Sequence, residues 1–427
     1  MAELSAMGEV VNRVANIGMR SYQWLRLATA MVLALGCFTL PAPVHAVESK
    51  PSLLPDQNVQ MASYERLFIQ GMDALANGEM AMALSSFRAL TEKKPDFRLA
   101  QLIYSDLLMA QANPIQKFGV LSKSKNESIK KLQVEAKARL MHQVKRLSKQ
   151  RLPASLLRLS KRHTHAIAVD LERSRLFLFD NRGGVPKLTS DYYISSGKKG
   201  AVKLKQGDKK TPVGLYYVTK YIPGEKLPDL YGSGALPLNY PNEWDRRHKR
   251  TGYGIWLHGT QSSTYSRPPK ASDGCVALTN LDFEKLEEST GIGTPVLISK
   301  QLDWISPNAW KDSQRTFLQK VYDWYEDLQS GQPERALRHY AKSFRNQKKG
   351  YRAWRKHVTR LVKGWDKRQF ILTDPSIFQY PGEESMVVVT FTQRHPEDTP
   401  GIWRLRRQYW KLEPAEARWQ IVYEDIG

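Results

Sequence analysis

The sequence predicts a multidomain α+β protein with an N-terminal α-helical segment, a central mostly-β domain and a C-terminal α+β domain. Three observations lead to this prediction. Apolar residues follow a helical period over residues 61–112, short β-rich runs bounded by Gly and Pro fill residues 163–300, and helical stretches precede alternating strands in residues 312–427. The chain of 427 residues is long enough for two or three domains with cores of their own.

The first 46 residues are typical of a secretory signal peptide. The apolar run 27–40 follows Arg20 and Arg26 and precedes a small-residue pattern that ends at Ala46, where we expect cleavage. Translation from Met19 would give a leader of ordinary length. An uncleaved anchor is the alternative, although the run is shorter than the roughly 20 residues of a membrane span. We therefore expect an exported protein of the periplasm or cell envelope, anchored in the inner membrane if the leader is retained.

Residues 47–60 are polar and predict a linker, and residues 61–162 predict a helical region. Two amphipathic helices resemble one tetratricopeptide helix pair at the positions of Gly71, Ala83, Phe87 and Pro95. The Lys- and Arg-rich stretch 115–162 predicts a long basic amphipathic helix, either a contact for anionic wall polymer or membrane surface or a solvated face. The formal net charge of +23 suits an anionic partner but does not identify it, and the function predicted below involves no nucleic acid.

The stretch 254–280 carries the residues for covalent catalysis. His258 ends an apolar run, a polar loop follows, and Cys275 lies on a Ser-x-Gly-Cys turn. After cleavage at Ala46 the chain keeps Cys275 alone, and a lone thiol in an oxidising compartment is a candidate reactive group. We predict that Cys275 is the nucleophile, that His258 is its base, and that the N–H groups of Gly274 and Cys275 bind the oxyanion.

These residues resemble the L,D-transpeptidases of the YkuD type, whose signature is a histidine, a loop of this length and Ser/Thr-x-Gly-Cys. Residues 207–216, GDKKTPVGLY, resemble a second motif of that family. The resemblance implies that residues 163–300 form a YkuD-type catalytic domain, that peptidoglycan stem peptides are the substrate, and that the carbonyl of Gly259 orients His258. It implies no metal or organic cofactor, and the sequence lacks the CxxC and HxxxH spacings of zinc sites.

The substrate is expected to contact side chains around this stretch. Arg267 and Lys270 lie between base and nucleophile, where either cation would hold a stem-peptide carboxylate or face solvent. Ser272 either sets the loop by a local hydrogen bond or contacts substrate. Asp273 stands where the family often has His or Arg. Tyr231 lies in a long predicted loop, residues 222–253, which in the family covers the active-site groove.

After a predicted linker at residues 301–311, the C-terminal region places helices before a curved antiparallel sheet. Residues 312–427 resemble the NTF2-like cone fold found behind some transpeptidase domains. The resemblance implies binding of a ligand or protein partner, or dimerisation, through the concave face.

On these grounds we predict an exported cysteine acyl-transferase that cross-links or remodels the cell wall. Cys275 would attack the carbonyl at position three of a stem tetrapeptide and expel D-Ala, and an amine would then accept the acyl group. The first alternative is a hydrolase, which uses water as the acceptor and trims stems or releases wall-linked protein. The second is a non-catalytic wall-binding scaffold.

Overall fold

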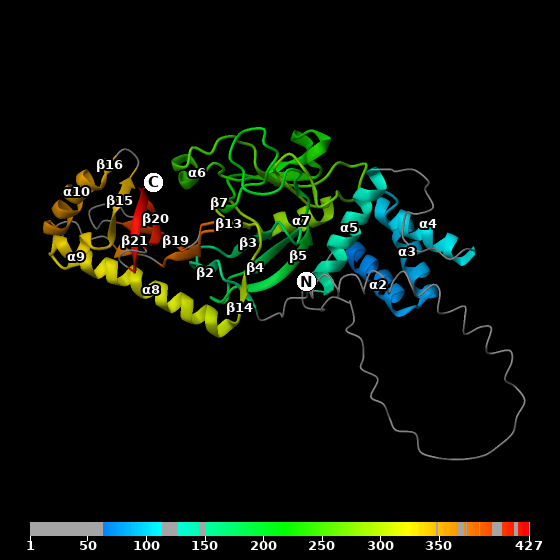
Figure 1. Ribbon diagram of the computed structural model, residues 1–427, viewed down its shortest axis with the longest axis horizontal. Coiled ribbons are helices and arrows are strands. Elements are labelled where there is room, and N and C mark those ends of the chain that lie inside the picture. The colour runs from blue at the N-terminus through cyan, green and yellow to red at the C-terminus, as the bar shows by residue number, and fades with distance from the viewer. Residues whose placement is uncertain are drawn as a thin grey trace, which may run out of the picture. The chain divides into compact units, whose positions relative to one another are not determined.

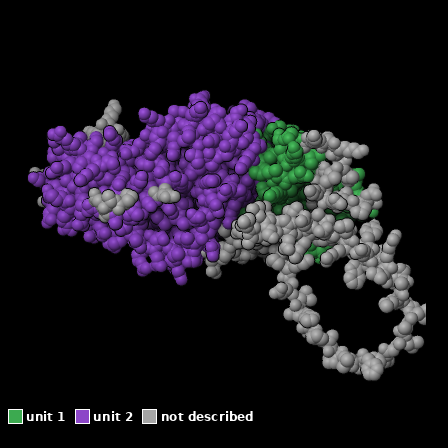
Figure 2. Space-filling model, viewed as in Figure 1, with its two compact units in different colours: residues 1–146, 261–269 green, residues 147–260, 270–427 purple. Residues whose placement is uncertain are grey.

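The computed structural model describes residues 63–112, 127–144, 151–346, 349–364, 371–372, 374–383, 385–394, 404–413 and 417–426. The chain divides into two units, which Figure 2 colours separately: Met1–Arg146 with Gln261–Pro269, and Leu147–Thr260 with Lys270–Gly427. The predicted signal peptide and the linker at 47–60 lie outside the described residues. In the described part of the chain, no helix has the length and apolar character needed to cross a membrane.

The described residues of the first unit form helices α2 (Ser63–Asn77), α3 (Met80–Lys93), α4 (Arg98–Ala112) and α5 (Glu127–Val144), shown from blue to cyan in Figure 1. The predicted helix pair corresponds to α2 and α3. A Cβ on Gly71 would lie 2.7 Å from the Phe87 ring, so glycine allows the two helices to pack closely. Phe68, Phe87 and Leu90 are fully buried in the core of this unit.

The prediction of one long basic helix over residues 115–162 is wrong in two respects. Helix α5 ends at Val144, and Leu152–Pro153 and Leu156–Arg158 form the short strands β1 and β2. Arg139, expected on the basic face, is only 1% exposed. It forms an ion pair with Glu135 at 3.0 Å, because a buried guanidinium needs a carboxylate partner.

The central domain is built on a mixed five-stranded sheet in the order β5-β4-β3-β13-β7. Its strands are β3 (His165–Asp170), β4 (Arg175–Asp180), β5 (Lys187–Tyr193), β7 (Gly214–Tyr217) and β13 (Pro295–Ser299). Strands β3 and β4 form an antiparallel hairpin, whereas β13 runs parallel to β3. Side chains alternate between faces: Ile167 and Val169 enter one core cluster, and Ala166 and Ala168 enter the other.

A second sheet of the central domain has the order β12-β10-β9-β8 and carries the candidate site. Its strands are β8 (Ile222–Pro223), β9 (Gly234–Pro237), β10 (Trp256–His258) and β12 (Val276–Ala277), and β6 (Ser196–Gly197) pairs separately with β11 (Lys270–Ser272). The prediction of a structureless loop over residues 222–253 is therefore wrong. That stretch also contains η1 (Gly224–Lys226), η2 (Asp229–Tyr231) and α6 (Glu243–Arg247), and α7 (Asn280–Glu288) follows the site.

The C-terminal domain packs helices against a sheet, as predicted, but the sheet is not wholly antiparallel, because Tyr340–Asn346 pairs in parallel with Arg418–Ile426. Helices α8 (Pro307–Gln329), α9 (Pro333–Leu337) and α10 (Tyr351–Lys363) accompany a sheet in the order β16-β15-β21-β20-β19-β18-β2, with β17 paired to β19. The strands are β15 (Tyr340–Asn346), β16 (Lys349–Gly350), β17 (Ile371–Leu372), β18 (Ser376–Gln379), β19 (Met386–Arg394), β20 (Arg404–Glu413) and β21 (Arg418–Ile426). Sequence patterns missed β15 and β18. Residues 301–311 are not a simple linker, because they contain β14 (Trp304–Ile305) and the start of α8.

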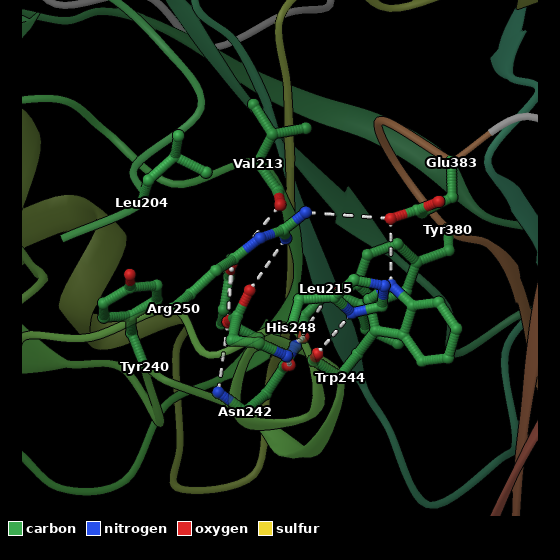
Figure 3. A network of polar contacts seen from close by, with 12 residues as sticks. Leu204, Val213, Leu215, Tyr240, Asn242, Trp244, His248, Arg250, Tyr380 and Glu383 are labelled. Carbon is green, nitrogen blue, oxygen red and sulfur yellow. Dashed lines mark hydrogen bonds and ion pairs between the residues drawn. The ribbon is translucent and has the colours of Figure 1, made fainter. Parts of the chain in front are cut away.

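The catalytic and C-terminal domains share one core. Strand β2, which precedes the catalytic domain, pairs with β18 of the C-terminal sheet. Trp244 stacks on Tyr409 at 5.4 Å between ring centroids, and its indole N–H donates to Glu383 at 3.0 Å. In Figure 3, Asn242 donates to the Tyr380 hydroxyl at 2.9 Å. The long-range contacts make these two domains one structural unit.

Candidate active site

The strand register brings the predicted base and nucleophile together. Strand β10 pairs in parallel with β12, placing Leu257 opposite Val276 and His258 opposite Ala277. Leu257 and Val276 point into the core. Because side chains alternate along a strand, Cys275, two residues before Ala277, lies on the same face of the sheet as His258.

The imidazole of His258 is fixed by its own chain. The side chain is 2% exposed, and Nδ1 lies 2.6 Å from the carbonyl oxygen of Gly259. A carbonyl accepts but cannot donate, so Nδ1 carries the proton and Nε2 is left as the basic nitrogen. This contact is the one that the family resemblance implied for Gly259.

Asn280 holds the segment that follows the base, and sequence reasoning missed it. Its Oδ1 accepts hydrogen bonds from the amide of Thr260 at 2.9 Å and from the amide of Ser233 at 3.1 Å. A side chain at Gly259 would collide with that oxygen. Asn280 is 22 residues from His258 in sequence and opens a helix, so no local pattern marks it as part of the site.

The turn before Cys275 depends on Gly274 and Ser272. Gly274 has φ +131°, and a Cβ there would lie 2.8 Å from the carbonyl oxygen of Lys210. The Ser272 hydroxyl donates to the carbonyl of Cys275 at 2.6 Å and accepts from the amide of Gly274 at 3.1 Å. Ser272 thus makes the local hydrogen bonds of the turn. The Gly274 amide, one of the two predicted oxyanion donors, is therefore engaged within the turn in this structure.

The predicted nucleophile is partly exposed. Cys275 carries a thiol that is not part of a disulfide, and this thiol donates to the carbonyl of Gly254 at 3.2 Å. A partly exposed sulfur beside a histidine is accessible to a substrate, unlike an inert cysteine in a core.

The second motif, residues 207–216, packs against the turn that precedes Cys275. Asp208 accepts hydrogen bonds from Lys203 Nζ at 2.8 Å and from the amides of Leu204 and Lys210. Burial alone would raise the pKa of the Asp208 carboxyl, but these hydrogen bonds outweigh it and lower the pKa to about 2. The folded motif places the Lys210 carbonyl against Gly274.

Tyr231 adjoins both reactive residues. Its ring centroid lies 5.1 Å from that of His258 and 4.8 Å from that of Trp256. Burial raises the pKa of Tyr231, and the negative charge of a Cys275 thiolate raises it further. Tyr231 therefore lies against the ring of the predicted base and within electrostatic reach of the predicted nucleophile.

The other predicted site residues differ in their exposure and in the unit to which they belong. Asp273 is exposed and forms an ion pair with Lys198 at 2.8 Å. Lys270 is exposed at the start of β11. Arg267 is half-buried and falls in the first unit, whereas Cys275 and His258 belong to the second. Within the described ranges, no group of three or more His, Cys, Asp or Glu side chains is arranged to hold a metal ion.

Comparison with known proteins finds two family matches. Residues 164–298 match the YkuD family, the L,D-transpeptidase catalytic domain, and residues 316–425 match the Cds6 C-terminal NTF2-like domain.

Among curated proteins, the chain is 29% identical over 121 residues to YafK of Escherichia coli K12, whose name assigns it to the L,D-transpeptidases. The match covers 28% of this chain and 44% of YafK, so the chain spans less than half the length of the curated relatives it matches.

Two solved structures share the fold over most of their length. Bd1075 of Bdellovibrio bacteriovorus has a TM-score of 0.56 and 26% identity, covering 65% of this chain and 98% of Bd1075. The helical cell shape determining protein Pgp2 of Campylobacter jejuni has a TM-score of 0.53 and 20% identity, covering 64% of this chain and 95% of Pgp2. Residues 164–298 are therefore similar to the YkuD family of L,D-transpeptidase catalytic domains, and residues 316–425 are similar to the Cds6 C-terminal NTF2-like domain.

Proposed function

We propose that this chain is an exported L,D-transpeptidase that transfers an acyl group from a peptidoglycan stem peptide through Cys275. The observation that carries the proposal is the β10–β12 register, by which a thiol and a histidine of assigned tautomer share one face of the sheet. The family match supports the reaction class. Export rests on the leader-like residues 1–46.

The chemistry follows from the two side chains. Nε2 of His258 takes the proton of the Cys275 thiol, and the thiolate attacks the carbonyl carbon of residue three of the stem. The amide of Cys275 donates to the oxyanion that forms. The C–N bond to D-Ala then breaks, and the departing amine takes the proton back from His258. The product of this half-reaction is a thioester on Cys275 and free D-Ala.

The second half-reaction restores the enzyme. The amine of another stem peptide attacks the thioester carbonyl and transfers a proton to His258. The bond to sulfur breaks, and the returning proton regenerates the thiol. The result is an amide cross-link, and no metal or organic cofactor takes part in either half.

The surrounding residues would hold the stem peptide. Tyr231 offers an aromatic wall beside His258, and Lys270 offers an exposed cation for a carboxylate. Asp273, held by Lys198, would meet a cationic group of the stem. The C-terminal domain would bind a partner or assemble, and the basic surface of α5 would face the anionic wall polymer or membrane surface.

The test is to incubate the purified protein with tetrapeptide-bearing muropeptides and to resolve the products by mass. We expect cross-linked dimers and free D-Ala from the wild-type protein and neither from Cys275→Ala. A carbapenem should add one covalent adduct to the wild-type protein and none to Cys275→Ala. Tripeptides without dimers would establish the hydrolase instead, and the absence of both products and adduct would favour the scaffold.

A further inference from the structure

The loop between the base and the nucleophile belongs to the core of the helical unit. The chain leaves the catalytic domain after Thr260 and returns to it at Lys270, and residues Gln261–Pro269 group with the helices (Figure 2). Strand β10 ends at His258, and β11 begins at Lys270, five residues before Cys275. The loop is therefore joined covalently to both reactive strands.

Tyr265 anchors this loop among aromatic side chains. It is 3% exposed, and its ring centroid lies 4.5 Å from that of Phe97 and 5.7 Å from that of Tyr64, which it meets edge-on. The ammonium of Lys94 lies 5.9 Å from the ring centroid, and the Tyr265 amide donates to the carbonyl of Asp96 at 3.3 Å. A loop residue thus fills a space that helices α2 and α4 would otherwise leave open in their core.

A second anchor follows directly. The Ser266 hydroxyl donates to Glu135 of α5 at 2.6 Å. Glu135 is 1% exposed and pairs with Arg139, which also pairs with Glu65 of α2. The guanidinium lies 5.3 Å from the ring centroid of Phe97, so the ionic and aromatic anchors share one buried cluster. Charge-assisted bonds of this kind are stronger and more directional than neutral ones.

The residues that follow Tyr265 and Ser266 extend the rigid part of the loop towards β11. Arg267 follows Ser266, and two prolines follow Arg267 before β11 begins. Proline fixes its own φ angle and restricts the residue before it, so the segment between Ser266 and Lys270 is stiff. The backbone position of Arg267 is consequently set by the helices.

We propose that the helical unit is a positioning domain for the transpeptidase site and that Tyr265 is its main positioning residue. This inference rests on the proposed function, because the loop that the helices hold joins the proposed base to the proposed nucleophile along the chain. Holding the loop in advance removes the ordering entropy that substrate binding would otherwise have to offset. The helices therefore act on substrate affinity, while the β10–β12 pairing alone keeps the thiol beside its base.

The test compares Tyr265→Ala with Tyr265→Phe, which keeps the ring, and with Ser266→Ala, which removes one hydrogen bond and leaves the aromatic core intact. In Tyr265→Ala we expect the KM for tetrapeptide muropeptides to rise about tenfold, because substrate binding would then have to order the loop, with kcat nearly unchanged. Ser266→Ala should raise KM about fivefold, and Tyr265→Phe should match the wild type. The rate of Cys275 alkylation by iodoacetamide should change by less than about twofold in all three, since it reports the thiol and its base.

Hydrogen exchange supplies the readout that is independent of activity. Amides in residues 261–269 should exchange about tenfold faster in Tyr265→Ala than in the wild type or Tyr265→Phe, with β10 and β12 unchanged. Protection that persists in Tyr265→Ala overturns the proposal, and so does faster exchange with an unchanged KM. If the wild-type protein has no transferase activity, the proposed function fails, and exchange alone decides whether the helices hold the loop.

Discussion

Replacing Trp244 with alanine tests whether the catalytic and C-terminal domains fold as one body. Trp244 lies in the catalytic domain, is 4% exposed, stacks on Tyr409 and donates to Glu383 (Figure 3). Truncating a buried tryptophan typically costs about 3–5 kcal/mol, a range that includes the lost contacts and the cavity. We therefore expect the free energy of unfolding to fall by about 4 kcal/mol, which lowers the Tm by about 10 °C in a unit of this size.

Differential scanning calorimetry with urea unfolding is the assay. Both domains should unfold in one transition, and Trp244→Ala should move that transition as a whole. The matched control is Tyr253→Ala, because Tyr253 is an aromatic residue of the same domain that is 77% exposed, and it should change stability by less than about 0.5 kcal/mol. Two separate transitions, of which the mutation shifts only one, would refute the reasoning, as would a fragment ending at residue 300 with unaltered stability.

This coupling also limits how a truncation is interpreted. Removing residues 301–427 would expose apolar residues of the shared core, among them Leu215 and Phe177, that pack with Tyr380 and Tyr409. A loss of wall activity in such a fragment would then report unfolding of the catalytic domain. Cys275→Ala in the full chain is the cleaner way to separate catalysis from binding.

Three further predictions concern the site. Gly274→Ala should lower the free energy of unfolding by about 2 kcal/mol and slow Cys275 alkylation at least about tenfold, because the added Cβ meets the Lys210 carbonyl. Gly293→Ala is the steric control, since Gly293 also has a positive φ but its Cβ would lie in open space. Equal alkylation rates in the two variants would contradict this account. Asn280→Ala should lower the free energy of unfolding by about 2 kcal/mol in a denaturant titration, since two amides lose their acceptor. Asn280→Asp keeps an acceptor oxygen and should retain most of the wild-type stability. Equal losses of stability in the two variants would argue against the acceptor role. The native pKa of Asp208 lies below its usual 3.8, so this carboxylate stabilises the fold fully above about pH 4 and loses that contribution, about 2 kcal/mol, as the pH falls towards 2. Asp208→Asn should flatten the acid limb of a stability–pH curve, and an unchanged limb would contradict the assignment.

Local patterns were sufficient where the determining interactions are local. The β3–β4 hairpin, the pair α2–α3 and the break between α8 and α9 follow from periodicity and from Gly and Pro positions. The predicted nucleophile was selected in the same way, since the Ser-x-Gly-Cys turn is a constraint within four residues. The Gly274 φ of +131° is the geometry that such a turn demands of glycine.

Patterns failed where a residue's partner is distant in sequence. Arg139 was expected on a solvated face, but Glu65, 74 residues away, neutralises it in a core. The stretch around Trp244 was expected to be loop, but its apolar residues pack on strands near the C-terminus.

The amino-acid sequence by itself predicted the domain order, the resemblance of the central domain to the YkuD family, and the thiol and imidazole that we propose as the reactive groups. Only the tertiary structure decided that these two groups share a sheet face, that Asn280 braces the base, and that the loop between them is part of a helical core. The physical reason is that propensity and turn geometry act over a few residues. Strand register and burial, by contrast, depend on apolar surfaces that are distant in sequence and pack together to exclude water.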